Sequence, residues 1–147
     1  MKILFLDDDK ARHRKFREWS IGCEVVFVFT YEEAIKALEE HVFDEAHLDH
    51  DLSEEAAMGL PVEGEKTGLD VAKHIAAMLP DKRPERVVVH SFNDAGARWM
   101  GRVLRDAGVR HHHSGHSRHH ADHQFPRRGA HGGKGRRFHP RLAGKGL

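Results

Sequence analysis

The sequence has few of the residues that mark secreted or membrane proteins. It holds one cysteine, Cys23, in 147 residues, so no disulfide can form within the chain. The apolar run that opens it, Ile3 to Leu6, is far too short for a membrane span or a signal peptide. Since a chain without disulfides suits a reducing compartment, we expect a cytoplasmic protein with no membrane partner.

Charge is nearly balanced over the whole chain but not along it. The formal net charge is +1, from 24 Lys and Arg against 23 Asp and Glu. Nine of the basic residues follow Gly108, together with one acid, Asp122, and nine of the fifteen histidines. The part up to Gly108 therefore carries −7 and residues 109–147 carry +8. We expect a folded domain over residues 1–108 and a poorly ordered, basic His/Arg/Gly-rich tail over 109–147.

Short apolar runs alternate four times with amphipathic segments before Gly108. The runs are rich in Val, Leu and Phe, a composition typical of strands buried on both faces. We expect strands at 2–6, 24–29, 43–48 and 86–90, with helices at 10–19, after Thr30, at 68–79 and after Asn93. This alternation predicts an α/β fold with a doubly wound parallel sheet. A fifth strand should follow Gly108, but His111 to His113 interrupt it at once, so we expect it to be absent or degenerate.

Local patterns indicate where two of the helices begin and which side chains are buried. Thr30 and Glu33 have the spacing of a capping box, and Asn93 is a good N-cap. We expect Trp99 to pack in the core and His13 to be solvated on its helix.

Polar side chains follow three of the expected strands. They are Asp7, Asp8 and Asp9 after the first, Asp49, His50 and Asp51 after the third, and His90, Ser91 and Asn93 after the fourth. In an open α/β sheet, ligands bind beyond the carboxyl ends of the strands. Carboxylates gathered there repel one another unless a cation neutralises them or their pKa values rise. The three segments therefore predict one acidic site.

A divalent metal ion suits this site. Carboxylate oxygens favour Mg²⁺ or Ca²⁺, whereas the addition of His50 and His90 would favour Mn²⁺, Fe²⁺ or Zn²⁺. We expect Mg or Mn, with a ligand set drawn from Asp7, Asp8, Asp9, Asp49 and Asp51. The alternative is that Asp7 to Asp9 only end a strand and favour the start of the next helix.

At these residues the sequence resembles the receiver domains of two-component response regulators over residues 1–108. Ile3 to Asp9 looks like the family's acidic metal-binding motif, and Asp49 matches the phosphoacceptor aspartate. Ser91 matches the Ser or Thr that ends the fourth strand, and Gly68 matches the glycine that opens the third helix. The resemblance implies a flavodoxin-like or receiver-like sheet.

Two departures point to a divergent branch of that family. Receivers carry a lysine at the end of the fifth strand and a proline after the phosphoacceptor, and neither is found here. The motifs Leu48-Asp49-His50-Asp51-Leu52 and His90-Ser91-Phe92-Asn93 look more like the cyclic-phosphate processing receiver domains. Members of that branch are predicted to handle cyclic phosphates, in RNA repair or nucleotide signalling.

The first functional hypothesis is a metal-dependent phosphoesterase acting on a cyclic phosphate of a nucleotide or an RNA end. A metal held by Asp8, Asp49 and Asp51 would act as a Lewis acid on a phosphate oxygen. His50 or His90 would serve as general base or acid, since the pKa of histidine lies near neutral. The hydroxyl of Ser91 and the amide of Asn93 would donate hydrogen bonds to phosphoryl oxygens.

Two alternatives use the same site. In a signalling receiver, Asp49 would accept a phosphoryl group from a partner kinase, although the absent lysine argues against this. In a non-catalytic binder, the site would hold a cyclic nucleotide without hydrolysing it. The sequence does not separate the binder from the enzyme.

The tail allows three interpretations. Its histidine clusters could bind Zn²⁺, Ni²⁺ or Cu²⁺, or its basic residues could form an arm that binds RNA. In the third interpretation, which we favour, a frameshift or divergence in a GC-rich gene replaced the family's own ending. That ending would leave a sheet edge uncovered and predicts marginal stability or oligomerisation.

Overall fold

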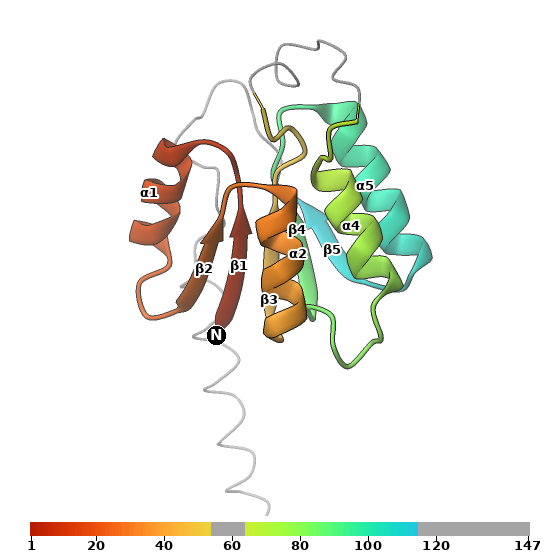
Figure 1. The fold of residues 1–147 in the computed structure, drawn as a ribbon, viewed down its shortest axis with the longest axis horizontal. Helices are drawn as coiled ribbons and strands as arrows, with labels where there is room; N and C mark the ends of the chain where they lie inside the picture. The colour runs from red at the N-terminus through yellow and green to blue at the C-terminus, as the bar shows by residue number, and fades with distance from the viewer. Residues whose placement is uncertain (54–63, 115–147) are drawn as a thin grey trace, which may run out of the picture.

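The computed structural model describes residues 1–53 and 64–114, which form a parallel five-stranded sheet in the order β2-β1-β3-β4-β5 (Figure 1). The strands are β1 (Lys2–Leu6), β2 (Glu24–Val28), β3 (Glu45–Leu48), β4 (Arg86–Val89) and β5 (Arg110–His113). The helices are α1 (Lys10–Trp19), α2 (Tyr31–Glu40), α4 (Gly68–Ala77) and α5 (Asp94–Asp106). The predicted doubly wound parallel sheet is confirmed.

Alternation along the strands divides the core between the two faces of the sheet, because successive side chains of a strand point to opposite faces. One face packs against α2, α4 and α5, and its core includes Leu4, Leu6 and Leu48. The other packs against α1 through Ile3, Phe5 and Phe16. Both faces of the sheet are therefore covered at β1, an internal strand whose carboxyl end leads to Asp7.

The expectation that the fifth strand is absent or degenerate was wrong. Arg110–His113 pairs in parallel with β4 from Arg86 to Val89. The pairing uses backbone groups, so histidine side chains do not prevent it, and an edge strand has one neighbour and tolerates polar residues. Gly108, at φ +74°, turns the chain after α5, and buried Val109 anchors the start of the strand. The edge of β4 is thus paired. Residues 54–63 and 115–147, with the predictions made for the latter, lie outside the described residues.

Both predicted N-caps are confirmed. The Thr30 hydroxyl accepts a hydrogen bond from the Glu33 backbone N–H at 3.2 Å. The Asn93 side-chain oxygen accepts one from the Gly96 N–H at 2.9 Å. The second cap fixes the N-terminus of α5, which begins five residues after the end of β4.

Two burial predictions were wrong. Trp99 lies on the outward face of α5 and is 55% exposed, with the Arg102 guanidinium 5.4 Å from its ring centroid. His13 is buried, because it shares the inward face of α1 with Phe16. Its Nε2–H donates to the Asp7 carbonyl oxygen at 2.7 Å, and its ring stacks on Phe29.

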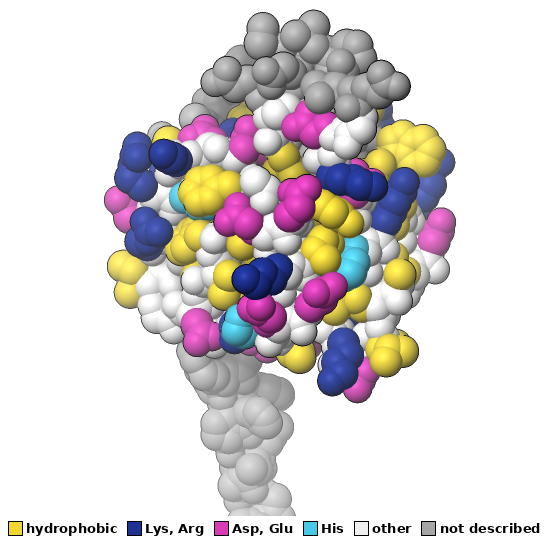
Figure 2. Space-filling view, in the orientation of Figure 1, with side chains coloured by type: hydrophobic (Ala, Val, Ile, Leu, Met, Phe, Trp, Pro, Cys, Tyr) yellow, Lys and Arg dark blue, Asp and Glu magenta, His cyan; other side chains and the backbone are white. Residues whose placement is uncertain are grey.

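The outer surface over α2 and α4 mixes side chains of both signs with apolar ones (Figure 2). No helix within the described residues is long and apolar enough to cross a membrane.

Candidate functional site

Backbone hydrogen bonds align the three polar segments at the carboxyl edge of the sheet. The Asp49 N–H donates to the Leu6 carbonyl at 3.1 Å, and the His90 N–H donates to the Leu48 carbonyl at 3.0 Å. The Asp7 N–H likewise donates to Val28 at 3.2 Å. The parallel ladder therefore continues one residue beyond the strands, and it brings the segments that follow β1, β3 and β4 side by side as predicted.

Three carboxylates meet at this edge. One oxygen each from Asp7, Asp8 and Asp49 lies within 4.8 Å of the others. Asp7 is fully buried and Asp49 is 5% exposed. Burial, with the charge of Asp7 next in importance, raises the pKa of Asp49 to about 8. Burial and Asp7 also raise the pKa of Asp8. Burial and like charge both disfavour the ionised forms of these carboxyl groups, and a bound cation would favour them.

Arg12 supplies positive charge to the cluster, a role that was not predicted from the sequence. Its Nε donates to Asp7 Oδ2 at 2.7 Å and its Nη2 to Asp7 Oδ1 at 2.9 Å, a two-pronged pair. Nη2 also lies 3.4 Å from Asp49 Oδ2. A signal was present in the sequence, because Arg12 falls in the first turn of a helix that opens at the site. Helical side chains lean toward the N-terminus of their helix, so this one leans toward the strand ends.

The other two predicted metal ligands lie outside this three-carboxylate cluster. Asp9 is the N-cap of α1, and its Oδ1 accepts from the Ala11 N–H at 2.7 Å. Asp51 Oδ1 lies 2.8 Å from His50 Nδ1 and accepts from Asn93 Nδ2 at 3.3 Å. Asp51 therefore contacts a candidate base rather than the cluster.

His50 is held in one place by its neighbours. Its Nδ1–H donates to Asp51, which leaves Nε2 as the nitrogen with an acceptor lone pair in the neutral ring. The ring packs on Gly96 of α5, where an added Cβ would lie 2.5 Å from His50 Cδ2. An added Cβ on Gly68 would overlap the Asp49 carbonyl oxygen. Both glycines therefore let helices approach the Asp49-His50 backbone closely.

The residues after β4 form the inner wall of the site. His90 is 2% exposed, stacks on Phe5 at 5.0 Å between centroids, and places Nδ1 3.6 Å from Asp7 Oδ2. Ser91 is also buried, and its Oγ accepts from the Asn93 N–H at 3.1 Å. All five predicted catalytic residues thus lie at this edge, with His90 behind the carboxylates and His50 beside them.

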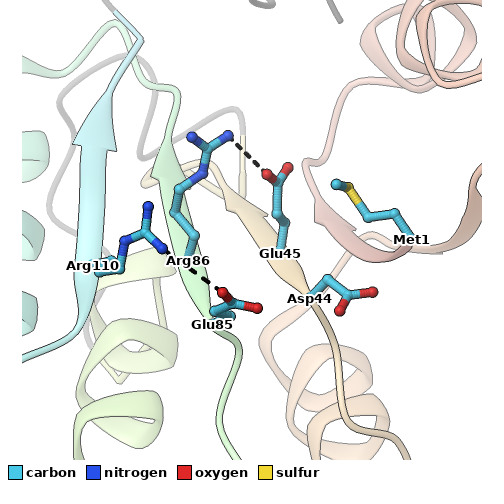
Figure 3. Close-up of a pocket in the computed structure, with 6 residues that line it drawn as sticks. All are labelled: Met1, Asp44, Glu45, Glu85, Arg86 and Arg110. Atoms are coloured by element: carbon cyan, nitrogen blue, oxygen red, sulfur yellow. Dashed lines mark hydrogen bonds and ion pairs between the residues drawn. The ribbon is translucent and has the colours of Figure 1, made fainter. Parts of the chain in front are cut away.

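A pocket of about 380 Å³ lies at the opposite, amino edge of the sheet (Figure 3). It is lined by Met1, Asp44, Glu45, Glu85, Arg86 and Arg110. Here the charges are paired. Arg86 contacts Glu45 at 2.7 Å and Arg110 contacts Glu85 at 3.7 Å, as the dashed lines in Figure 3 show. A hydrogen bond from His47 is the main cause that lowers the pKa of Glu45.

Comparison with solved structures identifies the fold. A CheY-like response regulator receiver domain protein from Methanospirillum hungatei JF-1 is 18% identical, with a TM-score of 0.53 over 79% of this chain and 82% of that one. A response regulator protein from Burkholderia pseudomallei, with a phosphorylated aspartic acid, calcium ion and citrate, is also 18% identical. Its TM-score is 0.52 over 79% of this chain and 61% of that one. At this identity the likeness concerns the fold.

Comparison of sequences identifies the family. No curated protein is significantly similar to this chain. The family model of the cyclic-phosphate processing receiver domain matches residues 2–106. This range runs from the start of β1 to the end of α5 and includes every candidate residue of the site. The chain therefore belongs to the family of cyclic-phosphate processing receiver domains.

Proposed function

We propose that this protein is a metal-dependent phosphoesterase that opens a cyclic phosphate on a nucleotide or an RNA end. One observation carries the proposal. A histidine oriented by its own carboxylate, His50 with Asp51, directly follows Asp49 of the acidic cluster. The family's name supplies the substrate class, and the cluster with its adjacent base supplies a means of hydrolysis.

The residues of the cluster fit a divalent metal ion. Asp7, Asp8 and Asp49 offer hard carboxylate oxygens within 4.8 Å of one another, which suits Mg²⁺ or Mn²⁺. The raised pKa of Asp49 is further support, because Arg12 only partly offsets the burial of this carboxylate, which therefore favours a bound cation or a proton. When bound, the ion would supply Lewis-acid polarisation of a phosphoryl oxygen. The similar Burkholderia pseudomallei response regulator carries a calcium ion.

His50 would act as the general base. Hydrolysis adds water across one P–O bond of the ring, so a proton leaves the water and another reaches the departing ester oxygen. His50 Nε2 can accept the first proton, because Nδ1–H is committed to Asp51 at 2.8 Å. Asp51 fixes this tautomer and stabilises the imidazolium that forms, so we assign it as a positioning residue. The imidazolium can then protonate the leaving oxygen.

The residues after β4 would shape the phosphate site. The Ser91 hydroxyl accepts from Asn93 and can still donate to a phosphoryl oxygen, since a hydroxyl does both. Asn93 acts mainly through others, because its amide contacts Asp51 and caps α5 at Gly96. His90 would hold Asp7 in place from the buried side.

The test is hydrolysis by the purified protein with Mg²⁺, Mn²⁺ or Zn²⁺ on a panel of 2′,3′-cyclic and 3′,5′-cyclic nucleotides. Asp49→Ala and His90→Ala would be assayed alongside, with folding checked by circular dichroism. Metal-dependent product that both substitutions abolish would establish the phosphoesterase and its substrate class. Absence of product from a folded, metal-loaded protein would contradict the proposal.

A receiver function is the second candidate. It is favoured by the position of Asp49 at the carboxyl end of β3 and by the phosphorylated aspartate in the Burkholderia pseudomallei regulator. It is disfavoured because Ser114, not a lysine, follows β5. Stable labelling of Asp49 by acetyl phosphate would support it, whereas tight binding of a cyclic nucleotide without product would indicate a non-catalytic binder.

The cellular setting is also a proposal. We propose a cytoplasmic protein, because its single cysteine suits a reducing compartment. Binding of RNA by the basic residues 109–147 is a prediction that salt-dependent RNA binding would test.

A further inference from the structure

Asp7 holds the Arg12 guanidinium in one orientation. Two of the three guanidinium nitrogens donate to the fully buried Asp7 carboxylate: Nε to Oδ2 at 2.7 Å and Nη2 to Oδ1 at 2.9 Å. A planar guanidinium held at two points cannot rotate away from its partner. The orientation of the third nitrogen, Nη1, is therefore fixed as well.

Within the described residues Nη1 makes no hydrogen bond, and it is not among the buried polar atoms that lack a partner. Asp9 Oδ2 lies 3.9 Å from Nη1, which is beyond hydrogen-bond distance. The Arg12 side chain is 21% exposed, and its guanidinium carbon lies 5.9 Å from the ring centroid of Phe92. Phe92 follows Ser91 and is 59% exposed. Nη1 thus has two N–H groups at the rim between α1 and the segment after β4.

The site needs a cation of this kind. A phosphoryl group that approaches Asp7, Asp8 and Asp49 meets like charge, and Ser114 rather than a cationic residue follows β5. Within residues 1–53 and 64–114, Arg12 is the basic side chain whose nitrogens contact all three carboxylates of this cluster. Arginine binds phosphate well because its fork of N–H groups matches the phosphoryl oxygens.

We propose that Arg12 is the phosphate-binding residue of this site, with its Nε and Nη2 anchored on Asp7 and its Nη1 donating to a phosphoryl oxygen. The inference rests on the proposed function, since it assigns the group that receives the substrate's phosphate. It makes Asp7 both a member of the acidic cluster and the anchor of the arginine. The competing account is that Arg12 is only a counter-ion that neutralises the cluster.

The experiment is calorimetric titration with inorganic phosphate at saturating Mg²⁺, with Mg²⁺ titrated separately. The variants are Arg12→Met, which removes the charge, and Arg12→Lys, which keeps it but removes the fork. Arg14→Met, at an exposed position of the same helix, is the matched control. Thermal melts would confirm that each variant is folded.

Arg12→Met should weaken phosphate binding by about tenfold to a hundredfold, the worth of a charge-assisted hydrogen bond, and Arg12→Lys by several-fold. Arg14→Met should bind as wild type. The Mg²⁺ affinity of Arg12→Met should be unchanged or higher, because a cation has left the cluster. If Arg12→Met fails to fold, the Arg12→Lys result decides.

The inference would be overturned if Arg12→Met bound phosphate as tightly as the wild type. If Arg12→Met does not fold, equal phosphate affinity in Arg12→Lys and the wild type would overturn it. A wild type that binds no phosphate would overturn it as well. Failure of the proposed function looks different. Arg12-dependent phosphate binding without turnover of any cyclic nucleotide would contradict the hydrolysis alone. Turnover with phosphate affinity that is indifferent to Arg12 would contradict the inference alone.

Discussion

The two edges of the parallel sheet carry the same kinds of charged side chains in different balance. At the amino edge, Glu45 lies opposite Arg86 in the β3–β4 register, and its two oxygens contact Arg86 at 2.7 Å and His47 at 3.1 Å. At the carboxyl edge, three carboxylates share Arg12. The pKa shifts at the two edges have opposite signs: a hydrogen bond from His47 is the main cause that lowers the pKa of Glu45, whereas burial, with the charge of Asp7 second, raises the pKa of Asp49 to about 8.

The difference distinguishes a structural ion network from a binding site. Charges that are matched within the fold stabilise it and leave little for a ligand to add. An excess of buried charge of one sign destabilises the fold and is relieved when a ligand binds. Substitutions at the carboxyl edge should therefore act mainly on turnover, and substitutions at the amino edge should act on stability.

The largest expected effect is on turnover when the histidine base is removed. His50→Gln should lower kcat for the cyclic nucleotide by about 10²–10⁴, the usual contribution of a general base. His74→Gln is the control, because His74 lies on α4, outside the site. Full activity in a His50→Gln, His90→Gln double variant that melts cooperatively would contradict the assignment of the acid–base role.

A second test moves the base without deleting it. Gly96→Ala places a Cβ 2.5 Å from the His50 ring and should displace it, with a loss of about 10² in kcat/KM. Gly101→Ala in the same helix is the control, since its Cβ would lie 3.6 Å from His111 Nε2, an ordinary contact. We expect Gly101→Ala to retain activity and gain about 0.5–1 kcal/mol of stability from helix propensity. Equal activity in the two variants would show that the position of His50 is unimportant.

At the amino edge the effect should fall on stability. Glu45→Gln removes the partner of Arg86 in a largely buried network, and we expect the free energy of unfolding to fall by about 1–3 kcal/mol. Glu85→Gln, in an exposed pair at 3.7 Å, should cost less than about 0.5 kcal/mol. Urea denaturation measures both changes, and a larger loss for Glu85→Gln would contradict the account of the pocket as a structural network.

The last expected effect is the pH dependence of stability in EDTA. Since the pKa of Asp49 is about 8 in the folded protein and about 4 in the unfolded chain, the folded state holds an extra proton between these values. Stability should therefore fall as pH rises from 5 to 8, by at least about 1 kcal/mol. Asp49→Asn should flatten this slope and raise the stability at pH 8. The lowered pKa of Glu45 acts in the opposite sense and at lower pH. A wild-type slope that Asp49→Asn leaves unchanged would contradict the shift.

Much of the fold and part of the site could be predicted from local pattern. The apolar strands and the polar residues after them indicated the carboxyl edge, and Asp7, Asp8 and Asp49 do meet there. The fifth strand was missed, because its pairing with β4 depends on backbone register rather than on its histidines.

The sequence grouped five aspartates that the structure separates. Asp9 and Asp51 differ from the cluster in side-chain direction, which is set by the α1 N-cap and by His50 rather than by residue type. Arg12 and His13 were missed as partners of Asp7 for a related reason. Their contacts with Asp7 depend on the angle at which α1 leaves the strand.

The measurement that tests the comparison most directly is Mg²⁺-dependent hydrolysis of a 2′,3′-cyclic nucleotide by Asp49→Asn and Glu45→Gln, each normalised to its folded fraction. Both variants neutralise one buried carboxylate, one at each edge of the sheet. The account predicts that Asp49→Asn loses turnover by at least about 10²-fold while Glu45→Gln retains it. Equal turnover in the two variants, or loss confined to Glu45→Gln, would contradict a catalytic site at the carboxyl edge.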